Sequence, residues 1–198
     1  MIAPKKVAYR RIGAYSGIIA PLIAFTCILF AIASYPQFSW ANNALSDLGI
    51  VPGLTALLFN FGLVASGFFA FLFASLGLFN YFGGTLLGKV GAESFEAASL
   101  ALMGIGIFNE SFQGTHYILS VAFFVLAPIS VFILTCAFWV AHQRGMAVFT
   151  VSVGVAAALP WLLLFAFNYV PNVAIPEFIS GLAVSAWTVL LSKKILKP

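Results

Sequence analysis

Six long apolar stretches, separated by short polar segments, constrain this chain more than any other feature. Each stretch is long enough to cross roughly 30 Å of hydrocarbon as a helix. Only 7% of the 198 residues are charged, whereas soluble domains carry about 25%. We therefore expect an all-α integral membrane protein, a six-transmembrane-helix bundle that forms a single transmembrane domain, 1–198. The spans are expected at about 12–34, 57–79, 93–112, 116–140, 146–170 and 176–191.

The nine basic residues all fall on one side of the expected bundle. An even number of spans places both termini on that side, together with the turns that hold Lys89 and Arg144. The positive-inside rule makes this side cytoplasmic. We therefore expect a multi-pass protein of the cell membrane with cytoplasmic N- and C-termini. Because the basic residues are scattered at helix ends, they indicate contact with the lipid bilayer and no nucleic-acid partner.

Small residues and prolines predict how the helices pack. Gly13 with Gly17, and Gly62 with Ser66, repeat at a spacing that lets helix backbones approach closely. Cys27 and Cys136 are expected in opposite halves of the bilayer, so a disulfide between them is not predicted. Three prolines fall inside spans and should bend them or free a backbone carbonyl: Pro21, Pro128 and Pro160.

The first outer connection, about 37–56, is longer than the others. It is too polar to span a membrane and too apolar to extend into water. We expect a short interfacial helix followed by a turn at Pro52-Gly53, lying across the outer mouth of the bundle. Ser46 or Asp47 is a candidate to cap a helix end, because short oxygen-bearing side chains accept from free backbone amides.

The uncommon polar residues gather on the face that has no basic residue. Three of the five acids, Asp47, Glu110 and Glu177, are expected there with His116, one of the two histidines. His116 and Ser120 are four residues apart, so they share one face of a helix. Polar groups at membrane depth are costly unless they serve a purpose. This outer face is therefore where any binding or reaction is expected.

A histidine beside a carboxylate permits several kinds of site. A metal centre needs three or four protein ligands, and one outer histidine without an outer cysteine does not supply them, so no metal is predicted. A general base needs a partner that holds the imidazole in one tautomer, a role that Asp47 could play for His116. The same pair could also serve only to pin the loop onto the bundle. The chain has no dinucleotide, phosphate-loop or haem-attachment motif, so no cofactor is predicted.

Three segments carry a resemblance to a known family. They are NALSDLG at 43–49, Phe59-Asn60 with Gly67, and HYILSVAFF at 116–124. In these residues, and over nearly its whole length, the chain resembles domain-of-unknown-function family 998, small prokaryotic multi-pass membrane proteins. It is more faintly similar to the Frag/DRAM/Sfk membrane proteins, which are linked to lipid handling. The resemblance supplies no activity and implies a shared polar set of Asn43, Ser46, Asp47, Asn60, His116 and Ser120.

We expect a non-enzymatic membrane protein whose outer-face pocket binds a lipid head group or a small polar ligand, in lipid handling or transport. One alternative is a membrane-embedded enzyme on a lipid-soluble substrate, with His116, Asp47 and Ser120 as its catalytic candidates. Another is a structural scaffold subunit. The sequence specifies neither the ligand nor the oligomeric state. The expected ligand-binding residues are Asn43, Ser46, Asp47, Asn60, Glu110, His116 and Ser120.

Overall fold

The computed structural model describes residues 4–82 and 84–197, and within these ranges the chain forms helices and turns without a strand. Six helical segments are long and apolar enough to cross a membrane, which agrees with the predicted fold class. Five are single helices: α1 (Pro4–Ala33), α4 (Leu86–Ile107), α5 (Gly114–Val140), α6 (Arg144–Phe167) and α7 (Ala174–Leu196). The other runs from α2 (Leu54–Leu72) through a π-helical turn, η2 (Phe73–Leu78), into α3 (Phe79–Phe82).

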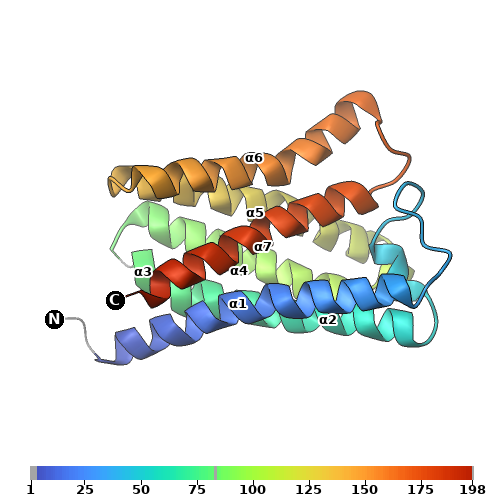
Figure 1. Ribbon diagram of the computed structural model, residues 1–198, viewed down its shortest axis with the longest axis horizontal. Helices are drawn as coiled ribbons and strands as arrows, with labels where there is room; N and C mark the ends of the chain where they lie inside the picture. Colours follow the sequence, from blue (N-terminus) through green and yellow to red (C-terminus); the bar gives the residue numbers. More distant parts are fainter. Residues whose placement is uncertain (1–3, 83, 198) are drawn as a thin grey trace.

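The spanning helices close into a ring. Each packs against the next one along the chain, and α7 packs back against α1. Both termini lie at one end of the bundle (Figure 1), which we call the terminal end. The opposite end, the loop end, carries two short 3-10 helices, η1 (Ser46–Ile50) and η3 (Glu110–Phe112). The two connections that contain short 3-10 helices therefore both lie at the loop end.

Large apolar side chains cover the outside of the ring. Leu22, Phe61, Leu162 and Phe165 are among the many that are well exposed along the helices. Soluble monomers rarely expose a continuous apolar surface of this extent. The natural solvent for this surface is the hydrocarbon of a lipid bilayer, as the spans predict.

The third span begins and ends earlier than the predicted 93–112. It starts at Leu86, where the side chain of Thr85 caps the helix by accepting from the Gly88 amide at 3.1 Å. The predicted span opened at the acidic residue Glu93, but the helix already runs through Gly91, which lies against Leu134, 2.6 Å from where a Cβ would stand. Glycine is used here for close packing between α4 and α5, and the helix therefore runs through it.

Close backbone approach also joins the first two spans. A Cβ added to Gly13 would collide with the backbone of Gly77 in the π-helical turn, and one added to Gly62 would collide with Cys27. The predicted packing role of these small residues is confirmed. Cys27 and Cys136 are both free, as expected from their separation.

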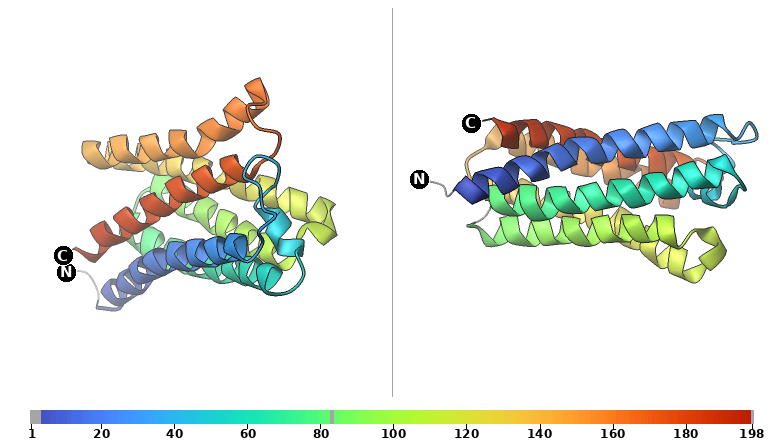
Figure 2. Two further views of the ribbon diagram at one scale, coloured as in Figure 1. Left: turned by 45° about the vertical axis from the view of Figure 1, so that its right-hand side comes forward. Right: turned by 90° about the horizontal axis from the view of Figure 1, so that it is seen from below.

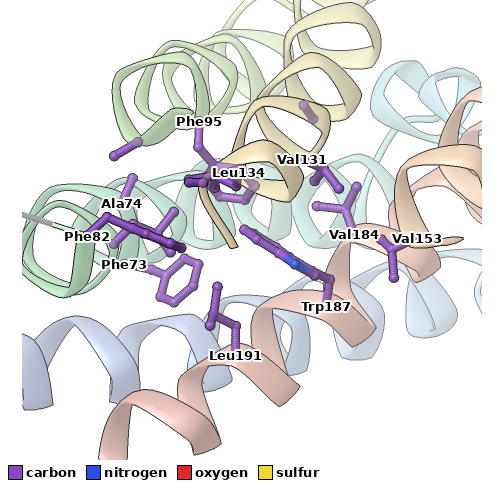
Figure 3. Packing of buried hydrophobic residues seen from close by; sticks show 14 of the residues in the cluster. Phe73, Ala74, Phe82, Phe95, Val131, Leu134, Val153, Val184, Trp187 and Leu191 are labelled. Carbon is purple, nitrogen blue, oxygen red and sulfur yellow. The ribbon is translucent and has the colours of Figure 1, made fainter. Parts of the chain in front are cut away.

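An aromatic core closes the middle of the ring. Phe73, Phe95 and Trp187 come from η2, α4 and α7 and meet with ring centroids 5.7–6.2 Å apart (Figure 3). The indole nitrogen of the fully buried Trp187 donates to the Thr150 hydroxyl on α6 at 3.2 Å. These contacts tie η2, α4, α6 and α7 together in the middle of the ring.

The loop predicted at 37–56 lies across the mouth of the bundle. Leu45 and Leu48 are buried in an apolar cluster with Phe59 and Ile28, and the chain turns at the predicted Pro52-Gly53 before α2 begins at Leu54. The expected cap at an α-helix end is not formed by Ser46 or Asp47. Ser46 is instead the first residue of η1, because apolar burial of Leu45 and Leu48 sets the position of this segment.

Candidate functional site

Three segments far apart in the sequence are joined by carboxylate hydrogen bonds at the loop end. The hydroxyl of Ser46 donates to Oε1 of Glu110 at 2.6 Å, which links η1 to η3. The backbone amide of Leu45 donates to Oε2 of Glu177 at 2.6 Å, which links η1 to the first turn of α7. We call Ser46, Asp47, Glu110, His116 and Glu177 the loop-end cluster. Its acids come from three different segments and face one region.

Asp47 holds the turn that precedes η1. Its Oδ2 accepts from the Asn43 side chain at 2.6 Å and from the Ala44 amide at 3.1 Å. Asn43 in turn accepts from the Ser39 amide at 2.9 Å through Oδ1, and its carbonyl accepts from the Ala174 amide. Asn43 therefore ties the loop to itself and to α7, and it does not line either cavity described below.

Asn60 holds the C-terminal end of η1 by a side-chain hydrogen bond. Its amide group donates to the carbonyl of Gly49 at 2.9 Å, and Asn109 donates to the same carbonyl at 3.2 Å. A Cβ on Gly49 would lie 2.6 Å from Oδ1 of Asn60. Asn60 thus fixes the end of η1 from α2, away from the loop-end cluster and outside both cavities.

His116 is oriented by the main chain. Its Nδ1 lies 2.8 Å from the carbonyl oxygen of Phe108, and because a carbonyl only accepts, Nδ1 carries the hydrogen. The direct hydrogen bond considered between His116 and Asp47 is not present, since Asp47 is engaged by Asn43 and Ala44. The ring is only 8% exposed, and Nε2 has no hydrogen-bond partner among residues 4–82 and 84–197.

The loop-end cluster opens into a cavity of about 700 Å³ between α5 and α6, which we call the α5–α6 groove. All five cluster residues line its polar end. Ser120 lines it one turn below His116, as their four-residue spacing predicted. The rest of its wall is apolar and comes from the two helices, including Phe124, Val125, Pro128, Ile129, Trp161 and Phe165.

The shape of α5 and α6 accounts for this groove. Pro128 lies inside α5 and Pro160 inside α6, and proline bends a helix by removing a backbone hydrogen bond. The loop-end halves of the two helices spread apart (Figure 2). Phe124 and Trp161 still meet across the gap with ring centroids 4.7 Å apart, so they form the inner wall of the groove.

A second, smaller cavity of about 110 Å³ lies inside the ring. Its wall is mostly apolar and includes Phe73 and Phe95 of the aromatic core. Four residues line both cavities and so form the partition between them: Ser46, Ser120, Phe124 and Glu177. The polar end of the groove therefore adjoins the cavity inside the ring.

The electrostatics of the cluster are dominated by its acids. Burial raises the pKa of the Glu110 carboxyl above its ordinary value, and the negative charge of nearby Asp47 raises it further, while the hydrogen bond from Ser46 opposes both. The basic residues that the structure describes lie at the other end, as with Arg144 at the start of α6 and Lys193 near the end of α7. No lysine or arginine in the described part of the chain is therefore placed to neutralise these carboxylates, and His116 is the basic side chain beside them.

The geometry of a metal site is not found in the part of the chain that the structure describes, since no three histidine, cysteine or acidic side chains there are grouped to hold an ion. No hydrogen bond joins Ser120 to His116 within those residues either. What the cluster offers is a set of acceptor atoms beside an apolar groove.

Glu177 was expected on the outer face but was not among the expected ligand-binding residues. The structure makes it the partner of the Leu45 amide and a wall of both cavities. The apolar half of the groove was not predicted from the sequence, although Pro128 and Pro160 indicate bends in the two helices that form it. Two prolines in consecutive spans, each near the outer half, are a pattern from which a gap between those spans could have been predicted.

Comparison with known proteins bears on the family alone. No curated protein and no solved structure gave a match. One family profile, described as "Protein of unknown function (DUF998)", matches residues 18–193. That range holds the loop-end cluster and the whole lining of the α5–α6 groove, and it leaves out α1 before residue 18 and α7 after residue 193. The chain therefore belongs to the DUF998 family of proteins of unknown function.

Proposed function

We propose that this protein binds an amphipathic ligand, with the ligand's polar group at the loop-end cluster and its apolar chain in the α5–α6 groove. One observation carries the proposal: a single cavity of about 700 Å³ is lined by Asp47, Glu110 and His116 at one end and by Val125, Ile129 and other apolar residues along the rest. This volume falls in the range of about 300–1,000 Å³ that is usual for ligand sites.

The apolar part of the groove faces the surroundings of the bundle. Val125 and Ile129 are 48% and 42% exposed, and Leu162 on the facing helix is 62% exposed. In a bilayer these side chains contact lipid tails. A lipid or lipid-like molecule can then reach the groove sideways from the membrane without crossing water. The positive-inside rule places the loop end on the extracytoplasmic side.

Binding has more support than catalysis. The imidazole of His116 is held by a backbone carbonyl, whereas a general base is usually strengthened by a carboxylate partner. Ser120, the nearest candidate nucleophile on α5, has no hydrogen bond to His116 among the described residues. In the proposed function Asn43 and Asn60 position η1, while Ser46, Asp47, Glu110, His116 and Ser120 face the ligand.

The proposal is tested by mass spectrometry of the lipids that remain with the purified full-length protein. Ile129→Trp fills the groove without touching the loop-end cluster and is expected to lose the bound species, and His116→Ala is expected to retain less of it. The matched control is Leu100→Trp, which places the same bulk at an exposed position of α4 outside both cavities and is expected to retain it. Equal retention by the wild type and a folded Ile129→Trp variant would rule out the groove as a binding site.

A further inference from the structure

We infer that the polar group of the ligand is a protonated primary amine, held by acceptor atoms of Asp47, Glu110 and His116. The inference rests on the proposed function and specifies the chemical class of the head group. An ethanolamine-type lipid head and a free long-chain amine share this chemistry, and the experiment below distinguishes them.

The first argument is the supply of unused acceptors. Asp47 is anchored through Oδ2, and Glu110 is anchored through Oε1. The Asp47 and Glu110 side chains interact with each other, but no side-chain hydroxyl, amide or backbone N–H in residues 4–82 and 84–197 donates to the second oxygen of either carboxyl. His116 uses Nδ1 for the Phe108 carbonyl, which leaves the lone pair of Nε2. A primary ammonium carries three N–H donors, and the cluster has three free acceptor atoms.

His116 supplies an observation that is independent of the acids. The residue is more than nine-tenths buried, yet it lines the groove and Nε2 has no partner within the described chain. Nε2 is not among the fully buried atoms, so it is open to the groove, where lipid cannot satisfy it as water would. In the neutral ring, the tautomer set by Phe108 makes this atom an acceptor that calls for a donor.

The supply of donors at the same place is small. Ser46 gives its hydrogen to Glu110, and Trp161 gives its indole hydrogen to Ser180 at 3.0 Å. The side-chain donors that remain on the groove wall are the hydroxyls of Ser120 and Tyr117 and the second amide hydrogen of Asn172, whose first is given to the Asn42 carbonyl. A phosphate or carboxylate head would need several donors and would also face the acids of the cluster. An anionic group at the tip of the head, in contact with the cluster, is therefore disfavoured by like charge and by desolvation without compensation, whereas in an ethanolamine lipid the tip is the ammonium and the phosphodiester lies one ethylene group further back.

The negative charges of Asp47 and Glu110 also favour a cationic head group. Asp47 and Glu110 are close enough to act on each other, and the basic residues lie at the far end of the bundle. Two carboxylates in a site of low dielectric repel each other unless a proton or a cation stands between them. A bound ammonium provides that cation and donates to both groups.

The test compares lysolipids with the same acyl chain and different heads. Full-length protein in phosphatidylcholine nanodiscs is mixed with equal amounts of lysophosphatidylethanolamine, lysophosphatidylcholine and lysophosphatidylglycerol, and bound species are counted by native mass spectrometry. We expect the ethanolamine lipid to be preferred by at least about tenfold. Its ammonium can donate two or three charged hydrogen bonds, and the trimethylated choline head has no N–H to donate. Glu110→Gln and Asp47→Asn should bring this preference to within about twofold while the chain still binds.

The matched control is Glu93→Gln, the same carboxyl-to-amide change at an exposed position of α4, which should keep the full preference. Equal binding of the three lysolipids by the wild type would overturn the inference and leave the proposed function standing. Binding no greater than that of Ile129→Trp for every lysolipid would overturn both. A second arm adds dodecylamine or dodecanol as competitor. Displacement by dodecylamine alone supports the amine and extends it to free long-chain amines, whereas equal displacement by dodecanol would contradict it.

Discussion

The hydroxyl of Ser46 donates to the carboxyl of Glu110 at 2.6 Å across a separation of 64 residues. This bond joins η1, which covers the mouth of the ring, to η3, which precedes the helix that carries His116. Both residues line the α5–α6 groove, and Ser46 also lines the inner cavity. The bond therefore sets the position of the polar end of the proposed ligand site.

Ser46→Ala should destabilise the protein. Ser46 is 7% exposed, so the variant leaves a largely buried carboxyl oxygen without its donor, at a cost of about 1–3 kcal/mol. The expected result is a lower thermal midpoint of the detergent-solubilised protein. Ser111→Ala is the matched control, because Ser111 is exposed on η3 and its side chain makes no such bond. An unchanged midpoint for Ser46→Ala would mean that η1 is held by its apolar contacts alone.

Stability should depend on pH through Glu110. The pKa of Glu110 is raised in the folded protein above its ordinary value of 4.5, chiefly by burial, so the folded state keeps the proton to higher pH than the unfolded state. The contribution of Glu110 to the free energy of unfolding is complete below pH 4.5 and is lost as pH rises through the raised pKa of its carboxyl. Thermal midpoints of the wild type should fall over this window.

Glu110→Gln should flatten that part of the profile, because the amide does not titrate. Asp47, Glu177 and His116 face the same groove and are present in both proteins, so the difference between the two profiles reports Glu110 together with its interaction with these neighbours. Parallel profiles for the wild type and Glu110→Gln would contradict the assignment.

Gly13→Ala tests the close approach between the first two spans. A Cβ at Gly13 would collide with the backbone of Gly77, and backbone cannot rotate away as a side chain can. Overpacking of this kind costs about 1–3 kcal/mol, which should appear as a lower thermal midpoint. The control is Gly145→Ala in the first turn of α6, where a Cβ meets nothing within 4 Å. That variant should be neutral or slightly more stable, because alanine favours helix by up to about 1 kcal/mol.

The tautomer of His116 can be observed directly. Since Nδ1 faces the Phe108 carbonyl at 2.8 Å, nitrogen NMR of histidine-labelled protein should find the hydrogen on Nδ1 in the neutral ring. His142→Asn removes the second histidine signal and suits that position, whose φ of 57° lies in the left-handed region that asparagine tolerates. A hydrogen found on Nε2 would contradict the acceptor role that the amine inference gives to this atom.

The sequence alone was enough to predict the class and the coarse plan of this protein. The number of spans, the turn at Pro52-Gly53 and the gathering of Asp47, Glu110, Glu177 and His116 at one end were all predicted correctly. These features depend on the length of apolar stretches and on the even count of crossings, which are local or simply additive properties. The start of the third span was wrong because the chain before Glu93 is already helical from Leu86, where Gly91 packs against Leu134 of α5, a contact that no local pattern records.

Only the tertiary structure decided which polar groups meet and what space lies beside them. The partner of His116 is the Phe108 carbonyl, the partner of Ser46 is Glu110, and Glu177 stands between two cavities. Each of these depends on how far a helix is rotated and bent, which is set by packing against its neighbours. The groove itself exists because α5 and α6 diverge towards the loop end, and divergence is a relation between two helices that neither sequence segment contains.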